Sequence, residues 1–179
     1  MADVLVRLMT DAFGHRRFGV QGGDIGAHVV TRLAATHPEL VTGLHLNFLS
    51  RLPSVDRPEG PTEAEARYEA EVAEWFREHV GYQWIQGTRP QTLAYAPTWP
   101  VCSARHGDWT VATHGARIAV PTAYLASPRE VVRPPRSLAE PFFDIQRRTE
   151  LPRGGHFAAL DEPEALAADL RAFFRDRRT

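Results

Sequence analysis

The sequence has no lysine, a single cysteine and no long apolar run. All 21 basic residues are arginine, and the net charge is −1. A charge this close to zero does not favour binding to nucleic acid or to a membrane surface. Cys102 has no second cysteine with which to form an internal disulfide. No apolar run approaches the roughly 18 residues that span a bilayer, and the Met1-Ala-Asp start lacks the layout of a signal peptide. We therefore expect a cytoplasmic protein.

The absence of lysine also excludes a phosphate loop of the kind that ends in lysine. The segment from Gly22 to Gly26 is a poor match to the dinucleotide pattern G-x-G-x-x-G. We expect neither a metal nor another cofactor, because no HxH, HxxxH or HExxH spacing occurs among His15, His28, His37, His45, His79, His106 and His114.

The length of 179 residues fits one domain with its own core, and the hydrophobic share of 43% is ordinary for a globular protein. Short apolar runs alternate with helical patterns, which is typical of a parallel sheet with right-handed crossovers. The predicted strands cover residues 17–21, 43–48, 118–126 and 145–151, and the helices cover 4–13, 27–36, a segment opening at Thr62, 90–96 and a last helix.

Three details complete this outline of the chain. Thr62 and Glu65 form a capping-box pattern at the start of a helix. Asp161 is expected to cap the last helix. Residues 50–61 read as a loop and 97–109 as irregular, so that 50–109 forms a loop and reduced cap within one domain over 1–179.

The segment Gly22-Gly23-Asp24-Ile25-Gly26 lies between a predicted strand and a predicted helix. The form small-x-nucleophile-x-small is that of a nucleophile elbow, in which glycines allow a strained turn. The Ile25 backbone N–H would then face the reacting centre beside the helix N-terminus. The alternative is an ordinary turn in which Asp24 caps the helix.

His156 follows the last strand and precedes the last helix, where sites of parallel sheets gather. Glu130 follows the strand 118–126, so that the chain order is nucleophile, acid and histidine, as in α/β-hydrolases. Glu130 would orient the imidazole and stabilise its charged form. A solvated loop histidine and a surface carboxylate are the alternatives, and Asp144 and Glu150 compete with Glu130.

Four segments resemble the microsomal-type epoxide hydrolases of the α/β-hydrolase family. They are Phe18-Gly-Val-Gln-Gly-Gly-Asp-Ile-Gly-Ala-His28, Gly81 to Ala96, Val120 to Glu130, and Arg153-Gly-Gly-His-Phe-Ala-Ala-Leu-Asp-Glu-Pro-Glu164, and the last is the most specific. The resemblance implies the C-terminal half of an α/β-hydrolase fold, with a mostly parallel sheet of about four strands, flanking helices and a remnant of the cap.

The resemblance also implies a mechanism without a cofactor. Asp24 attacks an epoxide carbon and forms an ester, and His156, supported by Glu130, activates the water that releases a diol. Substrate-binding residues are not evident. A haloalkane dehalogenase is a weaker alternative, because no halide-binding pair of Trp or Asn is evident.

The sequence departs from the family pattern in three ways. Trp is typical where Ile25 stands. The family's first strands and its His-Gly-x-Pro loop would lie before Met1, and the cap is short between Ala96 and about Val101, without a match to the two tyrosines that donate to the epoxide oxygen. We therefore expect weak or no activity, with a non-catalytic, partner-dependent fragment as the alternative. The strand 17–21 would have an open edge, from which we expect a homo-oligomer or a complementing chain.

Overall fold

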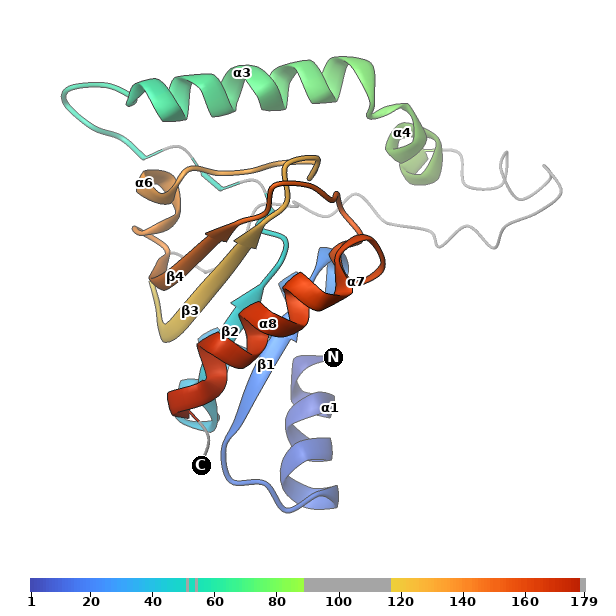
Figure 1. Cartoon of the computed structure of the whole chain (residues 1–179), viewed down its shortest axis with the longest axis vertical. Coiled ribbons are helices and arrows are strands. Elements are labelled where there is room, and N and C mark those ends of the chain that lie inside the picture. The colour runs from blue at the N-terminus through green and yellow to red at the C-terminus, as the bar shows by residue number, and fades with distance from the viewer. Residues whose placement is uncertain (51, 54, 89–116, 178–179) are drawn as a thin grey trace, which may run out of the picture.

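The protein is built on one four-stranded sheet in which all neighbouring strands are parallel, as predicted. The computed structural model describes residues 1–177 except 51, 54 and 89–116. The strands lie in the order β1 (Phe18–Gly22), β2 (Val41–Leu46), β3 (Ile118–Ala126) and β4 (Phe143–Glu150). All four carboxyl ends therefore point to the same edge of the sheet (Figure 1).

The middle of the sheet is buried on both faces. The successive residues Leu44, His45 and Leu46 of β2 are each fully buried, although successive side chains of a strand point to opposite faces. Parallel strands with helices on both faces are expected to read as continuous apolar runs. This explains why the apolar run 118–126 predicted the bounds of β3 without error.

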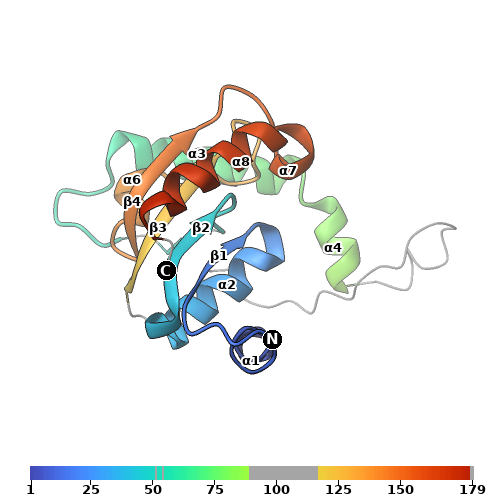
Figure 2. The same ribbon diagram turned by 60° about the horizontal axis from the view of Figure 1, so that its bottom comes forward.

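Helices cover both faces of the sheet (Figure 2). The ring of Phe174 in α8 packs against Gly19 of β1, where a Cβ would lie 2.5 Å from it, whereas Val30 of α2 packs against Gly22 on the opposite face. The helices are α1 (Ala2–Arg7), continued by a π-helical turn (Leu8–Ala12), α2 (Asp24–Thr36), α3 (Glu63–Glu78), α4 (Gly81–Thr88), α6 (Arg136–Ala139), α7 (Ala158–Asp161) and α8 (Pro163–Phe174), with 3₁₀ turns at Pro38–Leu40 and Arg175–Arg177.

The predicted capping box of α3 is confirmed. The Thr62 N–H donates to Glu65 Oε2 over 2.9 Å, and the Glu65 N–H donates to Thr62 Oγ1 over 3.3 Å. Arg57 also donates to both oxygens of Glu65. These bonds satisfy free donors of the first turn. The helix α3 lies beyond the carboxyl edge of the sheet (Figure 1).

Two helix predictions differ from the structure. Asp161 does not cap the last helix: it ends α7, and α8 begins at Pro163, whose fixed φ suits a first helical position. The helix predicted from Ala27 begins at Asp24, because the chain turns from β1 directly into α2. The helix predicted over 90–96 and the irregular segment 97–109 lie outside the described residues, and the short helices α4 and α6 were not predicted.

Candidate functional site

The three predicted site residues meet at the carboxyl edge of the sheet. Asp24 follows β1, Glu130 follows β3 and His156 follows β4. His156 lies between the two carboxylates: its Nδ1 is 2.7 Å from Glu130 Oε1, and its Nε2 is 3.6 Å from Asp24 Oδ2. The structure thus brings Asp24 together with two residues that lie more than one hundred positions further along the sequence.

The Glu130 carboxylate is buried, with a fully covered side chain. Its Oε1 accepts from His156 Nδ1 and from the Val131 N–H, at 2.7 Å each. The hydrogen bond to Glu130 raises the pKa of His156 above its ordinary value of 6.5; burial opposes this rise, and the charges of Glu130 and Asp24 add to it. Because Nδ1 donates to Glu130, the neutral ring presents an unprotonated Nε2 toward Asp24.

Asp24 has a strained backbone, with φ +48°, and no other non-glycine residue in the described part of the chain has positive φ. Such strain marks functional turns when the surroundings hold it in place. A Cβ at Gly22 would lie 2.6 Å from the Gly26 carbonyl oxygen, and a Cβ at Gly23 would lie 2.7 Å from the Asn47 side chain. The structure therefore requires small residues at Gly22, which the elbow pattern includes, and at Gly23, which that pattern leaves open, whereas a Cβ at Gly26 would meet nothing within 4 Å.

Hydrogen bonds join the turn before Asp24 to the end of the neighbouring strand, β2. Asn47 follows β2, and its N–H donates to the Gly22 carbonyl over 3.2 Å. Its side-chain oxygen accepts from Gln21 over 2.7 Å. Ile25, whose backbone N–H was the predicted oxyanion donor, is the second residue of α2. N–H groups of the first helical turn have no partner within the helix and point toward anions, so its position suits that role.

The loops that carry Glu130 and His156 are joined by backbone contacts. The Arg129 N–H donates to the Gly154 carbonyl over 3.2 Å, and Arg129 and Gly155 form a parallel bridge. Gly154 has φ +97°, which favours glycine. The Gly155 N–H donates to Asp161 Oδ2 over 2.8 Å. Asp161 therefore holds the His156 loop, a role that its sequence position as a helix cap did not reveal.

The two competing carboxylates are engaged elsewhere. Asp144 pairs with Arg117 at 3.1 Å, and Glu150 pairs with Arg148 at 3.1 Å. Glu130, and not either of these two, accepts the hydrogen bond from His156 Nδ1.

Aromatic rings surround the histidine. Phe48 packs edge to face with His156 at 5.6 Å, and Phe157 does so at 5.0 Å. Phe157 and the Ile25 side chain are exposed beside the site. The Asp24 side chain is 61% exposed, so an apolar molecule can approach the carboxylate past these side chains. Across the described ranges there is no cluster of three or more metal-ligating side chains. The helices in these ranges are also too short or too polar to cross a membrane.

The curated proteins that are similar to the chain include several epoxide hydrolases. No protein-family model matches the chain. It is 30% identical to the "Putative epoxide hydrolase" of Stigmatella aurantiaca over 92% of this chain and 48% of that protein. It is 27% identical to epoxide hydrolase 1 of Sus scrofa, covering 96% and 54%, and 26% identical to the juvenile hormone epoxide hydrolase of Manduca sexta, covering 94% and 52%. The chain spans about half the length of these relatives.

Solved structures show the same fold. The epoxide hydrolase of Aspergillus niger superimposes with a TM-score of 0.75 at 23% identity, over 99% of this chain and 57% of that one. The juvenile hormone epoxide hydrolase of Bombyx mori gives 0.73 at 20% identity, over 99% and 58%. The sheet and its helices therefore correspond to part of an α/β-hydrolase fold.

Proposed function

Because the chain is a homologue of the epoxide hydrolases, we propose that it hydrolyses an epoxide to a diol through an ester on Asp24. The observation that carries the proposal is the position of His156, hydrogen-bonded to Glu130 on one side and 3.6 Å from Asp24 on the other. A nucleophile, a base and a group that orients the base within reach of one another are the signature of covalent hydrolysis.

In the first step an oxygen of the Asp24 carboxylate attacks a ring carbon. A carbon–oxygen bond of the epoxide breaks, and the released alkoxide oxygen takes a proton from solvent water. The strained turn at Asp24 presents the side chain to the open side of the site.

In the second step His156 Nε2 takes a proton from water, and the resulting hydroxide attacks the ester carbonyl carbon. The Ile25 N–H stabilises the charge that develops on the carbonyl oxygen. Glu130 stabilises the imidazolium and fixes the ring orientation. Collapse of the intermediate breaks the ester bond, and the leaving oxygen takes the proton held by His156 to give the diol. Asp24 loses its acid proton to water and is restored as the carboxylate, with no cofactor required.

We expect slow turnover. The Asp24 side chain is 61% exposed, so water solvates the nucleophile and weakens the electrostatic interactions that act on the transition state. Each missing hydrogen-bond donor to the charge that develops in the transition state lowers the rate of such a reaction about 10²–10³-fold.

Trapping the ester tests the proposal even when turnover is slow. After incubation with styrene oxide, intact-protein mass spectrometry should find a covalent adduct that accumulates in His156→Gln, because water is no longer activated. Asp24→Asn should give none. Asp144→Asn is the matched control, since Asp144 pairs with Arg117 away from the site, and it should behave like the unchanged protein. No adduct on Asp24 in His156→Gln would contradict the proposal and favour a non-catalytic role.

A further inference from the structure

A second histidine, His28, lies beside the proposed nucleophile. It follows Asp24 by four residues on α2, so the two side chains are neighbours on one face of the helix, with Cβ atoms about 5–6 Å apart. Side chains of a helix lean toward its N-terminus, which directs the His28 ring toward the turn that carries Asp24. His28 therefore contributes to the wall of the proposed reaction centre.

Four rings form a continuous row along this wall. Phe48 lies between the two histidines, with its ring centroid 6.4 Å from that of His28 and 5.6 Å from that of His156. Phe157 continues the row 5.0 Å from His156. All three contacts are edge to face, at 61°, 83° and 79°. The row thus places one apolar ring, Phe48, between two rings that carry nitrogen atoms.

The two histidines of this row differ in what they can do. His156 Nδ1 contacts Glu130, and its Nε2 faces Asp24 at 3.6 Å, so both of its nitrogens have a part in ester hydrolysis. Burial lowers the pKa of His28 below its ordinary value of 6.5, and the Asp24 charge offsets this only in part. His28 is therefore a neutral ring at pH 7, with one nitrogen that donates a hydrogen bond and one that accepts. The two reaction steps use neither nitrogen.

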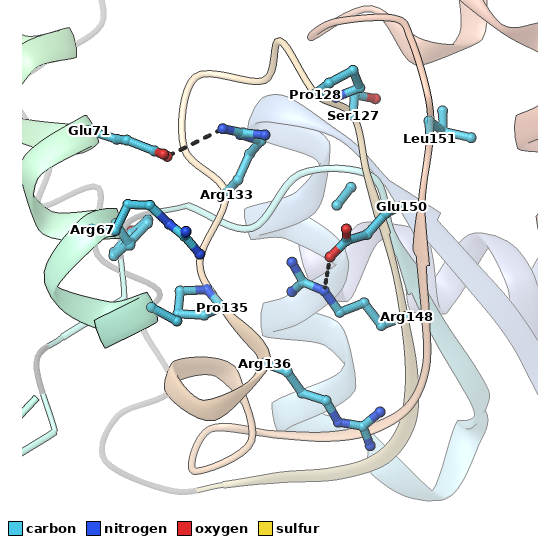
Figure 3. A pocket seen from close by; sticks show the side chains of 13 residues that line it. Arg67, Glu71, Ser127, Pro128, Arg133, Pro135, Arg136, Arg148, Glu150 and Leu151 are labelled. Carbon is cyan, nitrogen blue, oxygen red and sulfur yellow. Dashed lines mark hydrogen bonds and ion pairs between the residues drawn. The ribbon is translucent and has the colours of Figure 1, made fainter. Parts of the chain in front are cut away.

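A cavity of about 710 Å³ at the same edge of the sheet is separate from this wall. Figure 3 shows its charged lining, in which Arg133 pairs with Glu71 at 3.3 Å and Arg148 pairs with Glu150 at 3.1 Å. Among the described residues, its lining includes neither Asp24 nor any of the four rings. A substrate that reacts with Asp24 therefore lies against the row of rings and not in this cavity.

We propose that His28 binds a polar substituent of the substrate, so that the site prefers an epoxide with a hydroxyl group one carbon from the ring over an apolar epoxide of the same size. The inference rests on the proposed function, since attack by Asp24 fixes where the reacting carbon lies. The hydroxyl group exchanges a hydrogen bond with the neutral His28 ring, and the carbon atoms pack on Phe48. An apolar epoxide leaves the His28 ring without this bond, which lowers its relative rate.

A matched pair of epoxides tests the proposal. Glycidol and ethyloxirane differ only in that glycidol has a hydroxyl group where ethyloxirane has a methyl group. In His156→Gln, in which the ester should accumulate, intact-protein mass spectrometry gives the rate of adduct formation with each epoxide. The ratio of the two rates cancels any change that affects both epoxides equally. Addition of His28→Leu should lower the ratio of the glycidol rate to the ethyloxirane rate about fivefold, as expected for loss of one hydrogen bond.

Two further variants separate hydrogen bonding from packing. His28→Gln keeps a donor and an acceptor and should retain most of the preference for glycidol. His15→Leu, at an exposed histidine before the amino end of β1, is the matched control and should leave the ratio unchanged. An unchanged ratio in His28→Leu, or an equal loss in His28→Gln, would overturn the inference while the ester on Asp24 still forms. Absence of an adduct with both epoxides in His156→Gln would overturn the proposed function, and this inference with it.

Discussion

The proposed chemistry depends on one side chain, His156, whose charge is set by two carboxylates of different exposure. The Glu130 side chain is fully buried, whereas that of Asp24 is 61% exposed. The hydrogen bond to Glu130 is the largest influence on the pKa of His156 and raises it above 6.5. A base must be unprotonated to act, so ester hydrolysis should slow as the pH falls through this raised pKa.

Glu130→Gln should lower the pKa of His156, because the charge and the strong hydrogen bond are lost while burial, which favours the neutral ring, remains. Histidine ring resonances followed by NMR over pH 5 to 9 measure this directly, without any activity. The raised pKa also sets how the stability of the fold depends on pH. Protonated His156 stabilises the folded state fully below the pKa of the unfolded state, and this stabilisation is lost as the pH rises through the pKa of the folded state. A His156 midpoint at or below 6.5 in the unchanged chain would contradict the assignment.

Asp161→Ala should also change the pKa of His156, although Asp161 acts on His156 only through the loop between them. The Asp161 carboxylate accepts the Gly155 N–H at 2.8 Å and thereby fixes the loop that aligns His156 with Glu130. Loosening this loop should lower the pKa of His156 toward 6.5 and, in an active protein, reduce kcat more than it raises KM. Asp161→Asn keeps an acceptor oxygen and should recover most of the effect. The same titration in both variants would contradict a positioning role.

At the scale of elements, patterns that a single segment carries were predicted well. The apolar run of β3 and the Thr62–Glu65 capping box are local features, and the structure confirms both. The order of Asp24, Glu130 and His156 along the chain, combined with parallel strands, also sufficed to bring them to one edge. The predicted start of α2 at Ala27 was wrong, because the strained turn at Asp24 leads from β1 directly into the helix.

Contacts between distant elements could not be predicted, since no local pattern encodes them. The clearest example attaches α8 to the sheet. Asp169 of α8 is buried and accepts from His45 of β2 at 3.1 Å, and from Arg147 and Thr149 of β4 at 2.6 Å each. Burial alone would raise the pKa of Asp169, but the hydrogen bonds from His45, Thr149 and Arg147 outweigh it and lower that pKa to about 2.

Asp169→Ala should destabilise the fold by about 3 kcal/mol, because it leaves the buried His45 ring and the Arg147 charge without their partner. Urea unfolding followed by circular dichroism measures the change, with Asp176→Ala, at an exposed site, as the control near zero. The sign of the pH effect is that of a lowered pKa: the stabilisation is complete above the unfolded value near 3.8 and disappears as pH falls toward 2. A loss below about 0.5 kcal/mol for Asp169→Ala would show that the network is dispensable.

At the scale of the molecule, the sheet ends at β1. Among the described strands β1 pairs with β2 alone, so its other side presents N–H and C=O groups without a strand partner, a template for association with another chain. Its residues Phe18–Gly22 include neither proline nor charge, the features that usually block such edges. Nearby, α1 and the turn that follows expose Val4, Leu8 and Phe13, with exposed fractions of 65%, 43% and 62%. α1 lies beyond β1, on the side away from β2 (Figure 2).

We therefore expect the 179-residue chain to self-associate through this side at micromolar concentration. Sedimentation velocity across a range of concentrations should show a monomer that converts to a dimer or larger species. Leu8→Glu places a charge beside the edge and should shift the equilibrium toward monomer, because burial of a carboxylate in the contact is unfavourable. Phe76→Glu, at a similarly exposed residue of α3 beyond the opposite end of the strands, is the matched control and should leave association unchanged. A cooperatively folded monomer at all concentrations would show that the β1 edge is protected without a partner strand.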